Sequence, residues 1–319
     1  MIIKLYGVRG SLPAPLLNKD LRSRLRDVLK LAIERSISSI DQVEPFLDDL
    51  PDYLSYTTGG DTTCITVKHN NETMIIDAGT GLRQLGDEML LGPAGKGQAE
   101  IHIFFTHTHW DHIHGLPFFK PLYIPGNVVH FHSPLADLED RLAYQTDDRF
   151  FPMPFHNTAS QKVFHQLTGT IEPQPGLFID TYPLKHPGGS FAYRFRNQEN
   201  TFIFATDVEF NGDDLLNRND HLDFFGNADL LILDAQYTLD ESFMKIDWGH
   251  TSFSMAVNCA VHWKVQNLVL THHEPAYTDK RIYENYENAI EHRRILKQDR
   301  PHIFLAREGT IYRVGEEVV

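Results

Sequence analysis

Residues 106–112 read Thr-His-Thr-His-Trp-Asp-His and place four potential metal ligands close together: His107, His109, Asp111 and His112. The apolar run Ile-His-Ile-Phe-Phe directly before them predicts a buried strand, so the ligands lie where a strand ends and a loop begins. Alternate residues of an extended chain point the same way, which lets His107 and His109 reach one metal. The following turn can direct Asp111 and His112 to a second metal.

Imidazole nitrogen with carboxylate oxygen suits zinc, iron or manganese and does not suit calcium. A histidine-rich surface loop is the alternative, but four ligand types at these offsets rarely coincide by accident.

Three further residues repeat the same local pattern of an apolar strand, a ligand type and a loop. His186 follows Tyr-Pro-Leu-Lys and precedes Pro-Gly-Gly, Asp207 follows Phe-Ile-Phe-Ala-Thr, and His272 follows Leu-Val-Leu-Thr. Each one alone could be an ordinary loop residue. As a set they supply the additional ligands that a dinuclear hydrolytic centre requires.

The whole set, His-x-His-x-Asp-His followed by separate His, Asp and His at strand ends, resembles the metallo-β-lactamase superfamily over residues 2–314. Hydrolytic β-lactam enzymes often use Cys where this chain has Asp207, so the resemblance favours the phosphodiesterase, ribonuclease Z and glyoxalase-II-like branches. It implies a division of the ligands into two groups. One metal would be bound by His107, His109 and His186, a second by Asp111, His112 and His272, and Asp207 would bridge the two.

Asp247-Trp-Gly-His-Thr-Ser252, followed by a helix, a strand and Thr-His, is similar to ribonuclease Z and its small-molecule phosphodiesterase relatives. The resemblance implies that His250 acts beside the phosphate and is not a metal ligand. The alternative is a histidine that only packs at a helix start, where Thr251 or Ser252 is a suitable N-cap.

Several neighbouring residues carry weaker expectations. Asp77 could orient a ligating histidine. Arg9 could reach substrate phosphate or form a structural salt bridge, and His273 could support the site or be an exposed neighbour of His272. Asp61 has no assigned role.

These residues lead to the hypothesis of a metal-dependent hydrolase, most specifically a phosphodiesterase. The expected cofactors are two divalent ions per chain, with zinc preferred and manganese or iron open. Two cations lower the pKa of a shared water toward about 7 and so provide hydroxide at neutral pH. Asp111 and Asp207 would hold it in place. His250 would protonate the leaving oxygen.

Composition bears on the substrate. The 319 residues carry a net charge of −14, which disfavours non-specific binding to nucleic acid or an anionic membrane. Small phosphodiesters or cyclic nucleotides are therefore the expected substrates, and a nucleic acid is possible but not favoured. The alternatives are ester, thioester or lactone hydrolysis on the same site, tRNA 3′ processing, a mononuclear iron dioxygenase, and a non-catalytic sensor.

The number of cysteines and the length of the apolar runs indicate where in the cell the protein is expected. Cys64 and Cys259 form no disulfide framework and no metal motif, which favours reduced, packed thiols. No signal peptide and no run of 18 apolar residues is visible, so we expect a cytoplasmic protein without a membrane span.

The expected fold is a mixed α/β (α+β) αββα sandwich of the metallo-β-lactamase type. Residues 1–319 would form a single domain, with a helical insertion at 14–55. We expect residues 16–49 within it to carry any homodimer contact. The expected strands are 2–8, 62–68, 73–77, 101–105, 128–132, 162–171, 190–196, 201–205 and 230–233, then 268–271 and a final pair at 302–305 and 310–314. The expected helices are 16–36, 41–49, one ending near 91, 252–264 and 279–297, and residues 92–97 are a glycine-rich linker.

Overall fold

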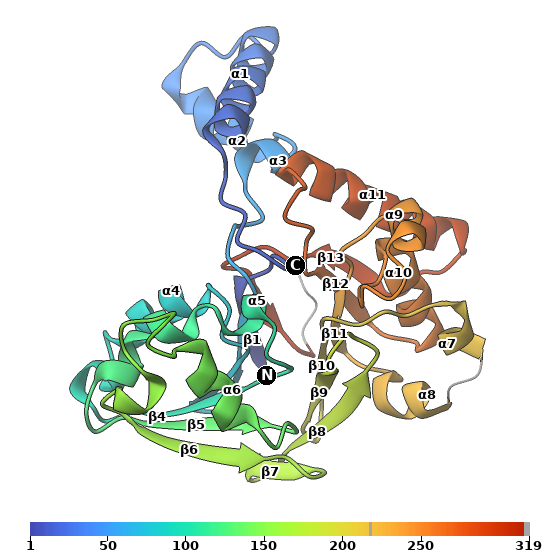
Figure 1. The fold of residues 1–319 in the computed structure, drawn as a ribbon. Helices are drawn as coiled ribbons and strands as arrows, with labels where there is room; N and C mark the ends of the chain where they lie inside the picture. The colour runs from blue at the N-terminus through green and yellow to red at the C-terminus, as the bar shows by residue number, and fades with distance from the viewer. Residues whose placement is uncertain (217–218, 316–319) are drawn as a thin grey trace.

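The computed structural model describes residues 1–216 and 219–315 as two β-sheets packed face to face with helices on their outer faces (Figure 1). This is the αββα sandwich that the sequence predicted. A helical arm near the N-terminus extends away from the sandwich.

The first sheet has the order β14-β1-β2-β3-β4-β5-β6. Its strands are β1 (Ile2–Gly7), β2 (Cys64–His69), β3 (Glu72–Ile76), β4 (Glu100–Phe104), β5 (Val128–Ser133), β6 (Gln161–Gln166) and β14 (Ile311–Arg313). β3, β4, β5 and β6 run parallel, so their carboxyl ends lie at one edge of the sheet.

The second sheet has the order β13-β12-β11-β10-β9-β8-β7. Its strands are β7 (Ile171–Gln174), β8 (Leu177–Leu184), β9 (Ser190–Arg196), β10 (Thr201–Ala205), β11 (Leu230–Asp234), β12 (Asn267–Thr271) and β13 (His302–Leu305). β10 to β13 are parallel. β10, β11 and β12 are nearly uniformly buried, as expected for strands covered on both faces.

The α-helices are α1 (Asn18–Glu34), α2 (Val43–Asp48), α3 (Asp52–Ser55), α4 (Leu82–Met89), α5 (Trp110–Ile113), α6 (Leu138–Gln145), α7 (Gly212–Leu216), α8 (Asn219–Phe225), α9 (Leu239–Met244), α10 (Phe253–His262) and α11 (Asp279–Ile295). The main hydrophobic core lies between the sheets, where Phe104 of the first sheet meets Phe195 of the second. Two further cores lie under the helices, one beneath α4 and α6 and one beneath α8, α10 and α11.

Three strand predictions need correction. The segment predicted as one strand at 162–171 is two strands in different sheets, β6 and β7, because the chain crosses between the sheets at Gly169, whose φ is 109°. The final strands at 302–305 and 310–314 are likewise not a pair, since β13 and β14 belong to different sheets. β8 was missed because its alternation is interrupted by Asp180, which is buried beside Arg194. In addition, the linker at 92–97 contains a short 3-10 helix, Pro93–Lys96.

The arm formed by α1, α2 and α3 has a small core of its own around Phe46, Leu50 and Leu54. No residue of α1 is buried. Arg22 and Arg26 of α1 are exposed, whereas Arg24 is partly buried. It forms an ion pair with Asp279 at the start of α11 and thereby ties the arm to the sandwich.

Two predictions about cell location can be compared with the described residues. Among them, no helix is long and apolar enough to span a bilayer. Cys64 and Cys259 are both free and buried, as expected.

Candidate metal centre

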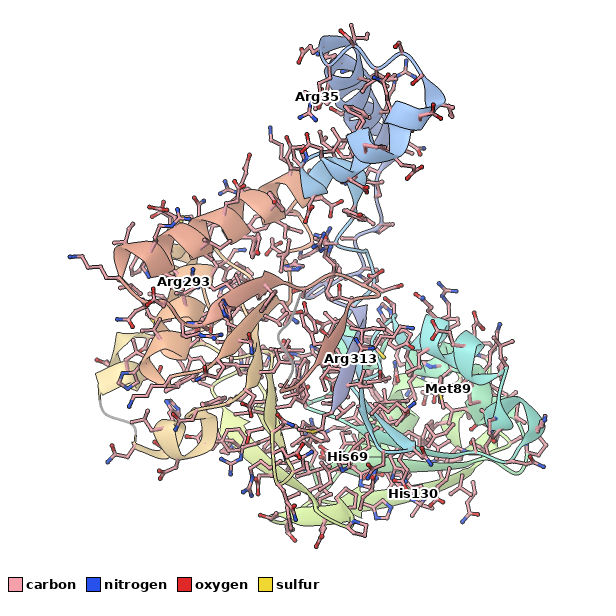
Figure 2. All side chains as sticks on the ribbon, turned by 180° about the vertical axis from the view of Figure 1, so that it is seen from behind. Arg35, His69, Met89, His130, Arg293 and Arg313 are labelled. Atoms are coloured by element: carbon pink, nitrogen blue, oxygen red, sulfur yellow. The ribbon has the colours of Figure 1, made fainter. Side chains whose placement is uncertain are left out.

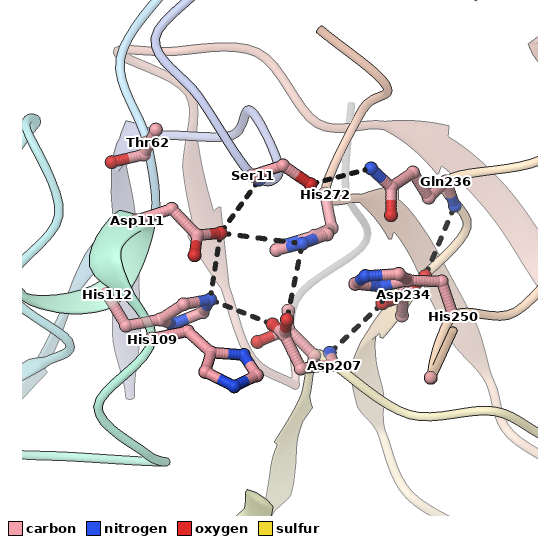
Figure 3. A network of polar contacts seen from close by, with 12 residues as sticks. Ser11, Thr62, His109, Asp111, His112, Asp207, Asp234, Gln236, His250 and His272 are labelled. Carbon is pink, nitrogen blue, oxygen red and sulfur yellow. Dashed lines mark hydrogen bonds and ion pairs between the residues drawn. The ribbon is translucent and has the colours of Figure 1, made fainter. Parts of the chain in front are cut away.

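The seven predicted ligands converge where the carboxyl ends of strands from both sheets meet. Figure 3 labels His109, Asp111, His112, Asp207 and His272 of this set, which face a common centre. They form two groups that share Asp207, with the ligand atoms of each group lying within 4.8 Å of one another. One group contains His107, His109, His186 and Asp207, and the other contains Asp111, His112, Asp207 and His272. This is the division that the resemblance implied.

The backbone has a left-handed conformation at three residues of the centre, each of which follows the end of a strand. Asp77 after β3, Asp207 after β10 and His272 after β12 have φ values of 60°, 60° and 62°. Non-glycine residues rarely adopt this left-handed conformation, and it is held only where the surroundings compensate. Asp77 thereby reaches Thr106 and His112, which lie beyond the end of the neighbouring strand β4.

In the first group, His109 Nδ1 lies 2.9 Å from His186 Nε2, and His186 Nε2 lies 3.5 Å from Asp207 Oδ1. The other ring nitrogen of His186 contacts the carbonyl oxygen of Gly249 at 2.9 Å. That contact fixes the ring with Nε2 facing the centre, which is the usual way in which a ligating histidine is oriented.

In the second group, His112 Nε2 is 2.8 Å from Asp207 Oδ2 and 3.3 Å from Asp111 Oδ2. His112 Nδ1 faces Asp77 Oδ2 at 2.7 Å, so Asp77 holds this ring as Gly249 holds His186. The backbone N–H of Ser11 donates to Asp111 Oδ2 at 2.8 Å and fixes that carboxylate. His272 Nε2 completes the group, 3.4 Å from Asp207 Oδ1.

Several buried atoms of these groups form no well-directed hydrogen bond with any described residue. They are Nε2 of His107, both ring nitrogens of His272, and, although they lie 2.8 Å apart, Nε2 of His112 and Oδ2 of Asp207. Buried polar atoms are almost always paired, so a cluster of unpaired ligand atoms requires another partner. Divalent cations satisfy imidazole nitrogen and carboxylate oxygen together, and the residues therefore fit a pair of metal ions.

The charges of the cluster lead to the same interpretation. Burial acts to lower the pKa of His112, but Asp207, Asp111 and Asp77 raise it well above its usual value. Burial acts to raise the pKa of Asp207, but His112 and His272 lower it well below the usual range. The three carboxylates thus require positive charge at this point, which bound cations would supply.

His250 lies beside the two groups, with its ring stacked on that of His272 at a centroid distance of 5.0 Å. Its Nδ1 contacts Asp234 Oδ2 at 2.8 Å. Burial acts to lower the pKa of His250, but Asp234 raises it to about 9. Asp234 therefore favours the protonated form of this imidazole, which is the form that can donate a proton.

The weaker expectations have mixed outcomes. Asp77 contacts a predicted ligand, as expected. Arg9 does not reach the site, because its buried guanidinium donates to the carbonyls of Gly59 and Tyr277, so the salt-bridge alternative is closer to the structure. His273 is 4% exposed, and its Nε2 lies 2.9 Å from the carbonyl oxygen of Ala306, so it is not an exposed neighbour. The helix after His250 is capped by Ser252, as expected.

Sequence reasoning gave no role to Asp234 or Ser11. Asp234 accepts from the backbone N–H of Asp207 at 3.0 Å and also contacts His250 Nδ1 at 2.8 Å, so it links Asp207 to His250. The pattern of an apolar strand followed by a carboxylate would have identified Asp234, since it ends β11. Ser11 acts through its backbone and leaves no such signal.

Comparison with known proteins assigns the family. The profile of the beta-lactamase superfamily domain matches residues 72–273. The chain belongs to this superfamily. It is a hydrolase of the metallo-β-lactamase type, as its fold and its sequence relatives indicate.

Sequence relatives and solved structures of this superfamily cover most of the chain. Ribonuclease Z of Prochlorococcus marinus (strain NATL1A) is 27% identical over 229 residues, which is 55% of this chain and 71% of the relative. The metallo-β-lactamase fold protein YhfI of Bacillus subtilis superposes with a TM-score of 0.62 at 16% identity and covers 98% of both chains. The short form of human tRNase Z superposes with a TM-score of 0.60 at 15% identity and covers 99% of this chain and all of its own (100%).

Proposed function

We propose that this protein is a metal-dependent phosphodiesterase that holds two divalent cations. His107, His109 and His186 would bind one cation, Asp111, His112 and His272 the other, and Asp207 would lie between them. The observation that carries the proposal is the pair of ligand groups sharing Asp207, with unpaired buried nitrogens facing inward. Zinc suits this donor set, and manganese and iron are the next candidates.

When bound, such cations make hydroxide available at neutral pH and neutralise charge on a phosphate. The protein's own residues would then do the positioning. Asp111, fixed by the Ser11 N–H, and Asp207, fixed near Asp234, supply anionic ligands whose orientation does not need to change during the reaction. Protonated His250, held by Asp234, would donate its proton to the leaving oxygen.

The rim of the site favours a substrate with an aromatic part. Trp110 directly follows His109 and is 59% exposed, while Trp248 directly precedes Gly249 and is 60% exposed. His109 and Gly249 both contact the ring of His186, so the two indoles belong to segments that meet at the centre. Exposed indoles stack on flat rings, which suits a nucleotide or an aryl phosphodiester.

A second candidate is removal of a tRNA 3′ extension. The relatives named ribonuclease Z favour it, whereas the net charge of −14 disfavours a large polyanionic substrate. Small phosphodiesters, including cyclic nucleotides, remain our first proposal. Ester, thioester or lactone hydrolysis and iron-dependent thiol oxidation are the outcomes to consider if no phosphodiester is cleaved.

The test is hydrolysis of bis(p-nitrophenyl) phosphate by metal-loaded protein, by chelated protein, and after zinc or manganese is added back. We expect turnover that is lost on chelation and restored by metal. A parallel assay with a 3′-extended pre-tRNA and with cyclic nucleotides separates the two candidates. A folded, metal-loaded protein that cleaves none of these substrates would overturn the proposal.

We also propose that residues 1–319 form one domain with 14–55 as an insertion, and that the arm binds a second copy of this chain. Along α1, Leu21, Leu25, Leu29 and Ile33 form an apolar row whose exposed fractions are 43%, 55%, 63% and 79%. Residues 18–34 contain five basic and three acidic residues, whereas 40–52 contain five acidic and no basic residues. A two-fold axis would place each basic helix opposite its partner's acidic segment and cover both rows.

The two buried free thiols suit a reducing compartment, and we place the protein in the cytoplasm on that basis.

A further inference from the structure

A second cluster of histidines lies on the first sheet, away from the candidate metal centre. It consists of His102 on β4, His130 and His132 on β5, and His165 on β6, with Glu100 at the start of β4. His102 is opposite His130 and His132 is opposite His165, so the side chains form two rows on one face. His132 also stacks on Phe104 at 4.4 Å, which places the cluster on the face toward the second sheet. Figure 2 labels His130 near the end of the molecule opposite the arm.

The rings within each row are nearly parallel. His102 and His130 have a centroid distance of 4.5 Å and an interplanar angle of 8°, and His132 and His165 have 4.5 Å and 10°. The rows are connected by nitrogen contacts. His102 Nδ1 lies 3.0 Å from His132 Nε2, and His130 Nδ1 lies 2.9 Å from His165 Nε2. The second row therefore holds the first row in a fixed orientation.

This arrangement leaves the Nε2 atoms of His102 and His130 outside the contacts between rows. His130 Nε2 is 2.9 Å from Glu100 Oε1, yet it forms no well-directed hydrogen bond with any described residue. One ligand atom each from Glu100, His102 and His130 lies within 4.8 Å of the others. An imidazole nitrogen this close to a carboxylate oxygen without a good hydrogen bond is the arrangement expected when both atoms face a common ion.

We propose that Glu100, His102 and His130 form an additional binding site for a transition-metal ion of the zinc type, oriented by His132 and His165. The orienting contacts repeat those of the candidate metal centre, where His186 and His112 point Nδ1 at Gly249 and Asp77 and turn Nε2 inward. A histidine whose second nitrogen is engaged in this way has a fixed tautomer and ring direction, which favours metal binding.

The dimensions fit such an ion. Bonds of about 2.0 to 2.2 Å at a tetrahedral ion place its ligand atoms about 3.4 Å apart. Ligand atoms that lie within 4.8 Å of one another can reach one such ion after side-chain movements of up to about 1 Å. The Glu100 side chain is 69% exposed while that of His130 is 14% exposed, which gives an ion a path from solvent to a partly buried site.

The site is separate from the candidate metal centre. His102 is the middle residue of β4, whereas His107 lies three residues beyond the end of the strand, and an extended run of this length spans up to about 16 Å. The proposal therefore stands whether or not the candidate metal centre is a phosphodiesterase.

The test is the zinc content of the tag-free full-length protein, measured after dialysis against micromolar zinc. We expect Glu100→Gln and His130→Gln each to bind one zinc fewer than wild type, with bis(p-nitrophenyl) phosphate turnover unchanged. His156→Gln, at a histidine whose side chain is 58% exposed and which lies outside the cluster, serves as the control and should match wild type. His165→Gln removes no ligand and should weaken the extra site about tenfold.

Zinc titration of the melting temperature gives a second measurement. Glu100→Gln changes an exposed side chain and should fold normally, so it remains decisive if His130→Gln does not fold. We expect added zinc to raise Tm less in Glu100→Gln than in wild type. Equal zinc content and equal shifts in wild type and Glu100→Gln would overturn the proposal.

Discussion

At the scale of single residues, Asp207 is the side chain on which both ligand groups depend. We expect Asp207→Asn to bind fewer metal ions and to lower kcat/KM for bis(p-nitrophenyl) phosphate at least about 100-fold, because a neutral amide cannot replace the shared carboxylate. Metal analysis and steady-state kinetics on the same preparation check both results. Retention of the full metal content together with activity would remove Asp207 from the bridging role.

His250 should behave differently from Asp207. His250→Gln removes the proton donor but none of the proposed ligands, so kcat should fall about 10²- to 10⁴-fold while metal content stays at the wild-type level. The same two measurements distinguish the variants. If His250→Gln lost metal, the histidine would be a ligand and not a general acid.

Residue types and local spacing were sufficient to nominate the seven ligands, because each follows an apolar run that the sequence shows directly. The same information missed Ser11, whose backbone N–H holds Asp111. For Arg9 it left a substrate contact and a salt bridge equally open, and the structure shows the ion pair with Asp279. Backbone donors and long-range ion pairs depend on which loops meet, and a linear pattern does not contain that information.

At the scale of elements, the exposed apolar row of α1 is the proposed contact with a second copy of this chain. We expect Leu25→Glu combined with Leu29→Glu to convert a dimer to a monomer, because two carboxylates would be buried in the contact. Light scattering after size exclusion measures the mass. Leu91→Glu, at a residue that is 90% exposed on the sandwich, is the matched control and should leave the mass unchanged. A wild-type protein that is monomeric at high concentration would contradict the proposed contact.

Periodicity predicted the helix at α1 but not which part of it would be covered. Its apolar positions divide between the small core around Phe46 and the exposed row that includes Leu25 and Leu29. Amphipathic spacing shows that a face is apolar and says nothing about whether the chain itself covers that face. Sheet membership was not predicted either, since β6 and β7 are close neighbours in sequence but belong to different sheets.

At the scale of the whole molecule, Glu308 joins the two sheets and the base of the arm. It lies in the turn between β13 of the second sheet and β14 of the first. Its backbone N–H donates to the carbonyl of Thr58, and its Oε1 accepts from the backbone N–H of Asp61 at 2.6 Å. Burial raises the pKa of Glu308 to about 7. The protonation of one carboxyl group therefore affects the point where three segments meet.

The direction of the resulting pH dependence follows from linkage. The ordinary pKa of this group is 4.5, so between pH 4.5 and about 7 the folded state keeps a proton that the unfolded chain has released. The contribution of Glu308 to the free energy of unfolding therefore falls as pH rises through this window, by roughly 2 to 3 kcal/mol in total.

Glu308→Gln keeps an oxygen acceptor for Asp61 and cannot ionise. We expect it to match wild type near pH 4.5 and to be more stable than wild type at pH 8. Urea unfolding of both proteins from pH 4.5 to 8 measures this difference directly, because other titrating groups contribute equally to the two curves. Curves that stay parallel across that range would show that Glu308 is ionised in the folded protein at the same pH as in the unfolded chain.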